Sequence, residues 1–267
     1  MLLTADIGNT SLLCGIYEDA ELVLQFRKSS AYRCSSDEMG TFLRSALREN
    51  AISPEKIQAI SFCSVVPDRV HSFRNACLKY FQLEPFELGP GVKTGLQIRY
   101  RNPLEVGADR IAGGLAAVNL FPGKNIIVVD FGTATTLDAI NKEKIYYGGA
   151  IFPGLETSME SLSLKTAKLP SVEILRREHV IGRSTSGSIQ SGLYFGQLGM
   201  VKEITNQMTK ELFKSDTPII LATGGFSRLF EPENIFHDVR TDLVLLGLRM
   251  AWELNYESKK SIEASAS

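Results

Sequence analysis

Short apolar runs alternate with amphipathic stretches along most of the chain, a pattern that predicts an α/β protein. The runs expected to form strands lie at residues 2–5, 12–17, 22–26, 57–63, 126–129, 137–140, 145–147 and 219–222. Helices are expected where apolar residues recur every three to four positions, at residues 39–47, 68–81, 102–120, 185–213 and 243–254. Ser35, Ser36 and Asp37 are candidate N-caps for the first of these helices.

Two of the predicted strands end in similar sequences. Leu3–Thr10 and Val128–Thr133 each combine an apolar strand with Asp-x-Gly and a small polar residue. The aspartates at 6 and 130 and the glycines at 8 and 132 are separated by the same interval. This repeat predicts two related α/β halves, although Asp-x-Gly turns are common enough to need further support.

Composition narrows the classes of partner. The chain of 267 residues has a net charge of −1 and a pI of about 6.4, so the basic excess typical of nucleic-acid binding is missing. The four cysteines form no C-x-x-C pair, which favours structural thiols in a reducing, cytoplasmic setting. Asp6 falls where a signal peptide would be apolar, and no run has the roughly 20 apolar residues of a membrane span. We therefore expect neither nucleic acid nor membrane as a partner.

The segment Asp6-Ile7-Gly8-Asn9-Thr10 has the residue types of a phosphate-binding turn. Glycine permits a tight turn, and the following N–H groups and the Thr10 hydroxyl are available for phosphate oxygens. Asp6 is a candidate Mg²⁺ ligand, directly or through water, because hard cations prefer oxygen. A hairpin turn in which Asp6 only caps its own backbone is the alternative.

A second hydroxyl-rich loop follows at residues 130–136, and Thr223-Gly224-Gly225 comes late in the chain. Together with the first loop, they resemble the nucleotide signature of the actin, Hsp70 and sugar-kinase superfamily. The resemblance implies duplicated ribonuclease H-like (actin-like ATPase) domains with a nucleotide cleft between them. We expect subdomains at residues 1–117 and 118–256, and a disordered tail at 257–267 that has little apolar surface to bury.

The sequence Asn102-Pro103-Leu104-Glu105-Val106-Gly107-Ala108-Asp109-Arg110 narrows this resemblance to one family. It is similar to a hallmark of the type III pantothenate kinases. Further blocks also resemble that family, at residues 89–96, 128–136, 148–154, 167–170 and 181–185.

The family resemblance implies a role for each of several residues. Asp109 would be the general base that accepts the proton of the pantothenate hydroxyl as this attacks the γ-phosphate of ATP. Arg110 would bind substrate or the transferring phosphate, and Gly107 and Ala108 would let the substrate approach the backbone. Tyr100 and Thr185 would also contact pantothenate. Gly132 and Thr133 would contact the ATP phosphates.

The resemblance also implies cations and a partner. Asp130 would bind a monovalent cation, K⁺ or NH₄⁺, in addition to the Mg²⁺ at Asp6, and the protein would be a homodimer. The reaction would yield 4′-phosphopantothenate and would be the first step of coenzyme A synthesis.

Other interpretations stay open at this point. Asp109 and Arg110 are also compatible with an ion pair on a solvated helix, Tyr100 with a packed aromatic residue, and Thr185 with a helix N-cap. At the level of function, the alternatives are a kinase for another hydroxylated metabolite and a non-catalytic nucleotide-dependent regulator. An Hsp70-type chaperone is not expected, because it would need an added peptide-binding domain for which 267 residues leave no length.

Overall fold

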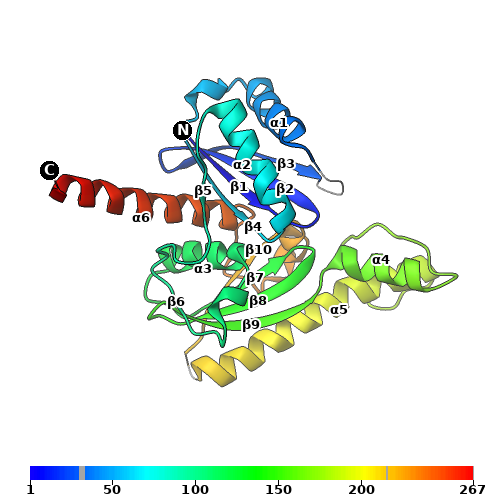
Figure 1. Ribbon diagram of the computed structural model, residues 1–267. Coiled ribbons are helices and arrows are strands. Elements are labelled where there is room, and N and C mark those ends of the chain that lie inside the picture. Colours follow the sequence, from blue (N-terminus) through cyan, green and yellow to red (C-terminus); the bar gives the residue numbers. More distant parts are fainter. Residues whose placement is uncertain (30–33, 215, 267) are drawn as a thin grey trace. The chain divides into compact units, whose positions relative to one another are not determined.

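The chain divides into two units, each built around its own β-sheet (Figure 1). The computed structural model describes residues 1–29, 34–214 and 216–266, with side chains described as far as Tyr256. Unit 1 consists of Met1–Gly95, Asn102–Ala116 and Asp242–Ser267. Unit 2 consists of Leu96–Arg101 and Ala117–Thr241.

The sheet of unit 1 begins as an antiparallel meander of three strands. β1 (Leu2–Ile7) pairs with β2 (Ser11–Glu18), which pairs with β3 (Glu21–Ser29). On the other side of β1, β4 (Ala59–Ser64) and β5 (Phe86–Glu87) add in parallel. The resulting order is β3-β2-β1-β4-β5. β1 is buried on both faces, which explains why its sequence is almost continuously apolar.

Helices α1 (Ser36–Glu49) and α2 (Pro67–Phe81) belong to one side of this sheet. Leu3, Ala5 and Ile7 of β1 join Leu43 of α1 and Phe73 of α2 in a single buried cluster. The alternation of side chains along β1 leaves Thr4 and Asp6 on the opposite side. A short 3₁₀ turn, Pro54–Lys56, leads from α1 toward β4.

The opposite side of the sheet packs against α6 (Leu243–Ala266), which in turn contacts α3 (Ala108–Leu120). The Ser61 hydroxyl of β4 donates to the Leu248 carbonyl of α6 at 2.9 Å. α6 packs so closely on α3 that a Cβ atom at Gly247 would overlap the carbonyl of Ala112. The side of the sheet that holds Asp6 is therefore packed against α6 of the same unit.

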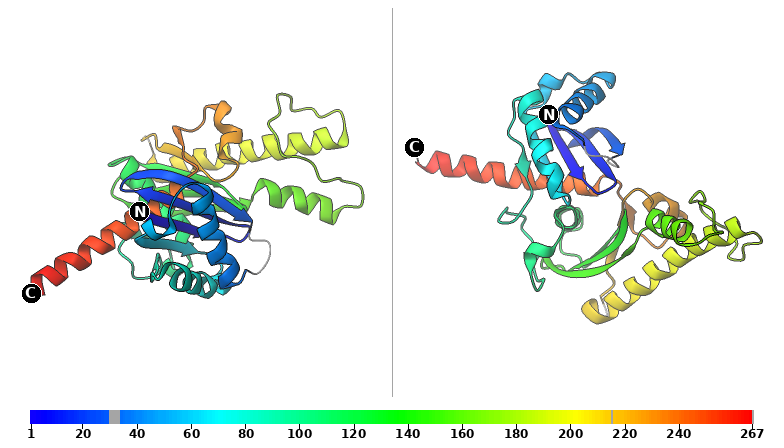
Figure 2. Two further views of the ribbon diagram at one scale, coloured as in Figure 1. Left: turned by 90° about the horizontal axis from the view of Figure 1, so that it is seen from above. Right: turned by 45° about the vertical axis from the view of Figure 1, so that its right-hand side comes forward.

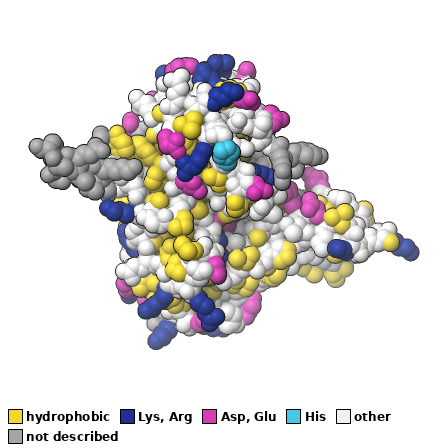
Figure 3. All heavy atoms as spheres, viewed as in Figure 1, with side chains coloured by type: hydrophobic (Ala, Val, Ile, Leu, Met, Phe, Trp, Pro, Cys, Tyr) yellow, Lys and Arg dark blue, Asp and Glu magenta, His cyan; other side chains and the backbone are white. Residues whose placement is uncertain are grey.

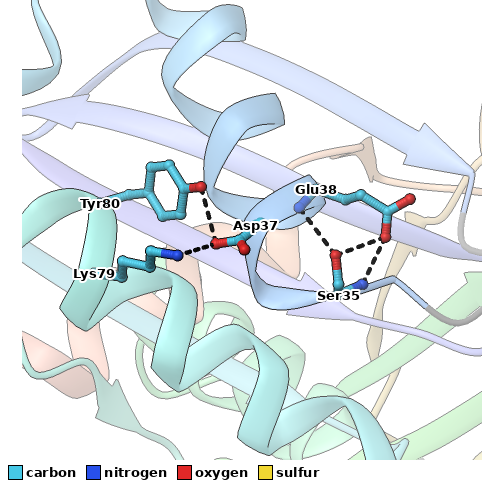
Figure 4. Close-up of polar contacts among 5 residues, drawn as sticks. All are labelled: Ser35, Asp37, Glu38, Lys79 and Tyr80. Atoms are coloured by element: carbon cyan, nitrogen blue, oxygen red, sulfur yellow. Dashed lines mark hydrogen bonds and ion pairs between the residues drawn. The ribbon is translucent and has the colours of Figure 1, made fainter.

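Side chains define the start of α1 (Figure 4). The Ser35 hydroxyl accepts from the backbone N–H of Glu38 at 3.2 Å, and the Glu38 carboxylate accepts from the N–H of Ser35 at 2.8 Å. This capping box confirms Ser35 among the candidate caps. Asp37 accepts from Lys79 at 2.6 Å and from Tyr80 at 2.9 Å, which joins the start of α1 to the end of α2.

The sheet of unit 2 contains a second antiparallel meander. β7 (Ile126–Phe131) pairs with β8 (Ala134–Ile140), which pairs with β9 (Ile145–Pro153). Three further strands pair in parallel, with β10 (Ile219–Thr223) next to β7, β11 (Asp238–Val239) next to β10, and β6 (Gln97–Ile98) next to β9.

The two sheets repeat one topology. Without β6, the order β9-β8-β7-β10-β11 matches β3-β2-β1-β4-β5 strand for strand, with the same pairing directions. Asp6 and Asp130 occupy the same position, next to last in the first strand of each meander. The repeat predicted from the two Asp-x-Gly segments is thus a duplicated α/β unit.

The longest helix of unit 2, α5 (Thr185–Met208), continues as a π-helical turn at Thr209–Phe213. α4 (Leu155–Lys165) lies beside the first part of α5 in both views of Figure 2. An aromatic stack runs through the core of the unit, with ring centroids 4.8 Å apart for Phe131 and Phe230 and 5.1 Å apart for Tyr194 and Phe230. Phe230 belongs to a 3₁₀ helix, Ser227–Glu233.

The helix predicted at residues 102–120 is wrong in its first third. Asn102 caps a separate 3₁₀ turn, Pro103–Glu105, and Val106 is extended, so that α3 begins only at Ala108. The Asn-Pro start signal was genuine, but it belongs to the short turn. Asp109 consequently lies in the first turn of a helix. α4 is a helix that the sequence analysis did not predict.

The two units differ from the predicted subdomains in three places, the smallest of which is Ala117, which belongs to unit 2. Residues 242–256 were expected in the second half, but α6 packs on β1, β2 and β4 and belongs to unit 1. Leu96–Arg101 belongs to unit 2, because β6 pairs with β9. A disordered tail was expected at residues 257–267, whereas the backbone of α6 continues to Ala266. The side chains from residue 257 onward lie outside the described residues.

Candidate active site

The turn after β1 is held by hydrogen bonds from both of its sides. The Gly8 N–H donates to the Ser11 carbonyl at 2.9 Å, and a Cβ atom at Gly8 would come within 3.2 Å of that oxygen. Arg69, in the first turn of α2, donates from one guanidinium nitrogen to the carbonyls of Gly8 at 2.8 Å and Asn9 at 3.3 Å. Since these carbonyls are bound by Arg69, the orientation of the two peptide planes at the turn is fixed.

Asp6 lies just before this turn, beside Cys63 of the parallel strand β4. The Cys63 thiol donates to Asp6 Oδ1 at 3.4 Å. Burial and then repulsion by the Asp109 carboxylate raise the pKa of Asp6 to about 7, against weaker opposing effects of the Cys63 hydrogen bond and the Arg27 charge. Two half-buried carboxylates thus lie near each other in unit 1, an arrangement that favours a bound cation.

The position of Asp109 depends on the break before α3. Its carboxylate oxygen Oδ1 accepts from the Arg110 N–H at 2.8 Å, at the helix end where anions are favoured. A Cβ atom at Gly107 would lie only 2.4 Å from the same oxygen. An alanine at this position would therefore displace the Asp109 carboxylate, and the expected approach of substrate to Gly107 stays a prediction.

In unit 2, the turn Gly132-Thr133 is enclosed by the end of β9. The Gly154 N–H donates to the Thr133 carbonyl at 3.0 Å, and the Thr157 hydroxyl donates to the same oxygen at 2.7 Å. A Cβ atom at Gly154 would lie 2.2 Å from the Gly132 carbonyl oxygen. Two of the segments selected from the sequence, residues 130–136 and 148–154, are therefore in direct contact.

Gly224 packs against Asp130. Its φ is +90°, and a Cβ atom there would lie 2.3 Å from Asp130 Oδ1 and 2.6 Å from the backbone of Phe131. Only glycine leaves this space beside the carboxylate. The third predicted nucleotide segment, Thr223–Gly225, is thus adjacent to the second one, and Gly224 packs directly against the Asp130 carboxylate.

Tyr100 and Thr185 occupy separate places in unit 2. The Tyr100 ring lies over Gly148 of β9, where a Cβ atom would approach it to 2.7 Å. Thr185 is exposed and is the first residue of α5; the cap is Ser184, whose hydroxyl accepts from the Gly187 N–H at 3.1 Å. Thr185 lines a cavity of about 1060 Å³ between α4 and α5, together with Ser158 and Arg183.

The described residues contain no group of three His, Cys, Asp or Glu side chains arranged to hold a metal ion. A cation at Asp6 would therefore take its remaining ligands from the nucleotide and from water, which is common for Mg²⁺. In the part of the chain that the structure describes, no helix combines the length and the apolar character needed to cross a bilayer. On the face shown in Figure 3, acidic and basic side chains are interspersed.

Comparison with known proteins identifies the family. A family model described as type III pantothenate kinase matches residues 2–207. The chain is 53% identical over 255 residues to a type III pantothenate kinase of Legionella pneumophila (strain Corby), covering 96% of this chain and 99% of that protein.

The chain belongs to the type III pantothenate kinase family.

Solved structures with low sequence identity support the fold of this family member. A putative Baf family transcriptional activator from Campylobacter jejuni has a TM-score of 0.62 at 19% identity, covering 96% of this chain and 99% of that chain. A putative 2-dehydro-3-deoxygalactonokinase from Sinorhizobium meliloti has a TM-score of 0.60 at 14% identity, covering 94% and 95%. Together with the duplicated topology, they confirm the predicted pair of ribonuclease H-like domains.

Three residues of this type III pantothenate kinase family member that shape the site were not selected from the sequence. Arg69 binds the turn after β1, Cys63 donates to Asp6, and Gly154 makes space for the second turn. Gly154 stood in a recognised block, but without a role. Arg69 and Cys63 carried no signal, because their importance comes from pairing between distant segments.

Proposed function

We propose that this protein transfers the γ-phosphoryl group of ATP to pantothenate and yields 4′-phosphopantothenate and ADP, the first step of coenzyme A synthesis. The observation that carries the proposal is the 53% identity with a type III pantothenate kinase over 96% of the chain. The adjacency of Asp6 and Asp109 in unit 1 supports it, because phosphoryl transfer requires a base and a cation near the reacting groups.

Asp109 is the proposed general base. Its carboxylate would accept the proton from the primary hydroxyl of pantothenate as the hydroxyl oxygen bonds to the γ-phosphorus and the bond to the ADP oxygen breaks. The start of α3 supports this role, because Gly107 leaves the carboxylate its space and the Arg110 N–H orients it. A base of this kind contributes about 10²–10⁴-fold to the rate.

The turns after β1 and β7 are the proposed phosphate-binding elements. In unit 1, Asp6, Ile7, Gly8, Asn9 and Thr10 would contact the nucleotide, and in unit 2 Gly132 and Thr133 would. Backbone N–H groups at such turns are suited to anionic oxygens. Pantothenate would be bound by Tyr100, Gly107, Ala108, Arg110 and Thr185.

Two cations fit the residues present. Asp6 would hold Mg²⁺, since a divalent charge relieves the repulsion with Asp109 that raises the Asp6 pKa. Asp130 would hold K⁺ or NH₄⁺ at the end of β7, as the family resemblance implies. When bound, the ions neutralise phosphate charge, while the chain orients the reactants.

The proposal includes an oligomeric state and a cellular location for the protein. A homodimer in the cytoplasm is expected from the family resemblance and from the metabolites involved. Sedimentation analysis of the purified protein would test the oligomeric state.

The test of this function is ADP formation from ATP, Mg²⁺ and pantothenate, with and without K⁺, for the wild type and for Asp109→Asn. We expect pantothenate-dependent turnover that requires K⁺ and falls by about 10²–10⁴-fold in the variant. ADP binding by the variant serves as the control for folding. A wild type without turnover on pantothenate would contradict the proposal, and a screen of other alcohols would then follow.

A further inference from the structure

One row of residues crosses four strands of the unit 1 sheet through Asp6. Asp6 pairs with Cys63 of β4 on one side and with Leu13 of β2 on the other, and Leu13 pairs with Arg27 of β3. Residues paired in this way project to the same face of a sheet. Arg27 therefore shares its face with Asp6, at a backbone separation of about 10 Å across two strand spacings.

The Arg27 side chain can extend across Leu13 toward Asp6. An arginine side chain is long enough to span much of this separation, and Leu13, with its short apolar side chain, offers no charged group in between. Arg27 is exposed, and among residues 1–29, 34–214 and 216–266 no hydrogen bond or ion pair of its guanidinium group is found. Its charge nevertheless reaches the Asp6 carboxylate.

The neighbouring residue shows that this arrangement is specific to one face. Lys28 projects to the other side of β3, where its ammonium group lies 5.1 Å from the centre of the Phe42 ring and 3.4 Å from Cys34 Sγ. Lys28 thus has a packing role on the α1 side. Arg27 has none there, and its side holds the two carboxylates of the site.

The site needs positive charge. A nucleoside triphosphate carries several negative charges, and it would have to approach Asp6 and Asp109, which already repel each other. A guanidinium group offers a planar pair of donors that matches phosphate oxygens. The turn itself contributes backbone N–H groups and the Thr10 hydroxyl, but no cationic side chain.

We propose that Arg27 binds the terminal phosphates of the nucleoside triphosphate and extends the phosphate site from the turn after β1 to the third strand of the sheet. The inference rests on the proposed kinase function, because it assumes that the nucleotide binds at this turn. It adds a binding residue that sequence motifs did not indicate.

The test combines three variants with separate measurements of nucleotide binding and turnover. Arg27→Gln removes the charge, Arg27→Lys keeps the charge but loses the paired donors, and Lys28→Gln is the matched control on the opposite face. We expect kcat/KM for ATP to fall by about 10- to 100-fold in Arg27→Gln, with KM for pantothenate unchanged. Arg27→Lys should be intermediate, and Lys28→Gln should resemble the wild type.

Binding titrations show where Arg27 acts. The loss of affinity in Arg27→Gln should be larger for ATP and ADP than for AMP. If folded Arg27→Gln binds ATP as tightly as the wild type does, the inference is overturned, even if kcat falls. Wild-type turnover on pantothenate is measured beside it, so that failure of the kinase proposal is recognised separately.

A measurement on the wild type alone covers the case in which Arg27→Gln does not fold. Phenylglyoxal modifies accessible arginines, and mass spectrometry quantifies the modification of Arg27. ATP should protect Arg27, and pantothenate alone should not. Equal modification with and without ATP would overturn the inference.

Discussion

Folding disfavours the anionic form of the Asp6 carboxyl group relative to its neutral form. Its pKa is raised from 3.8 to about 7 by burial and by Asp109. A raised carboxyl pKa means that this residue's contribution to stability is fully present below its unfolded pKa and is lost as the pH rises to about 7. Above that pH, the shift corresponds to at most about 4 kcal/mol, since each unit is worth about 1.4 kcal/mol.

Replacing Asp6 with asparagine should therefore stabilise the nucleotide-free protein and abolish its activity. We expect a higher urea midpoint for Asp6→Asn at about pH 8, and a smaller difference at about pH 5, where Asp6 in the folded wild type is protonated. Turnover should be lost because the charge that holds Mg²⁺ is gone. A variant that is less stable than the wild type at about pH 8 would contradict this explanation.

Gly107 tests whether the position of the Asp109 carboxylate controls the rate. In Gly107→Ala, the new methyl group would meet Asp109 Oδ1 at 2.4 Å, and the carboxylate would have to move. We expect kcat to fall by about 10- to 100-fold, as small displacements of a catalytic group do, with an unchanged fold.

Gly113→Ala is the matched control on the same helix. A Cβ atom there would meet only Leu243 Cδ2, at an ordinary 3.9 Å. This variant should keep its activity and gain stability slightly, because alanine is the better helix former. If both variants lost activity equally, a general sensitivity of α3 would replace the carboxylate explanation.

At the scale of elements, the start of α2 supports the turn that follows β1. Arg69 of α2 donates to the carbonyls of Gly8 and Asn9 in the turn after β1. α2 itself comes after β4, so this contact joins two segments that are distant in the sequence. α2 thus supports the turn after β1 through Arg69. We expect this support to affect the binding of the nucleotide rather than the binding of pantothenate.

Arg69→Ala should raise KM for ATP about tenfold, because hydrogen bonds from a charged group contribute about 1.5–3 kcal/mol and part of the loss is replaced by water. KM for pantothenate should change little. Arg74→Ala is the control from the same helix, since Arg74 pairs with Glu84 and Glu87 at the surface. Equal KM values for ATP in both variants would show that Arg69 does not support the turn.

At the scale of the whole molecule, the backbone passes between the two units at residues 95–96, 101–102, 116–117 and 241–242. α3 begins in unit 1 and ends in unit 2, and α6 completes unit 1 from the far end of the sequence. Neither unit is a continuous segment. We therefore expect the two units to unfold together.

The cysteines provide a measurement of this behaviour, because all four belong to unit 1. Cys14, Cys63 and Cys77 are buried, and burial raises the pKa of each thiol, to about 12 for Cys77. Cys34 is partly exposed. In the native protein, a thiol reagent should modify Cys34 first, since thiolates are the reactive form.

In a urea titration, modification of the three buried cysteines should coincide with the loss of the far-ultraviolet circular dichroism signal, to which both units contribute. ATP should shift both transitions to higher urea by mass action. Thiol exposure well before the loss of circular dichroism would mean that unit 1 opens independently.

Local patterns in the sequence were sufficient for most strands and helices. β1 and β7 are recognisable because strands buried on both faces are mostly apolar. α1 is recognisable because apolar residues recur every three to four positions after the candidate cap Ser35. The predicted helix at residues 102–120 was wrong at its start, because a capped 3₁₀ turn and an α-helix begin with the same residue types. The two-residue strands β5, β6 and β11 have no periodicity that could reveal them.

The sequence alone was enough to establish the α/β class, the duplication and the family, since these depend on residue types at short spacing and in a fixed order. Contacts between segments distant in the chain were decided only by the tertiary structure. Register across the sheet brings Arg27 and Cys63 into the row of Asp6, and the packing of α6 places it in unit 1. Such neighbours are chosen by strand pairing and packing over the whole fold, and no local pattern of residues encodes them.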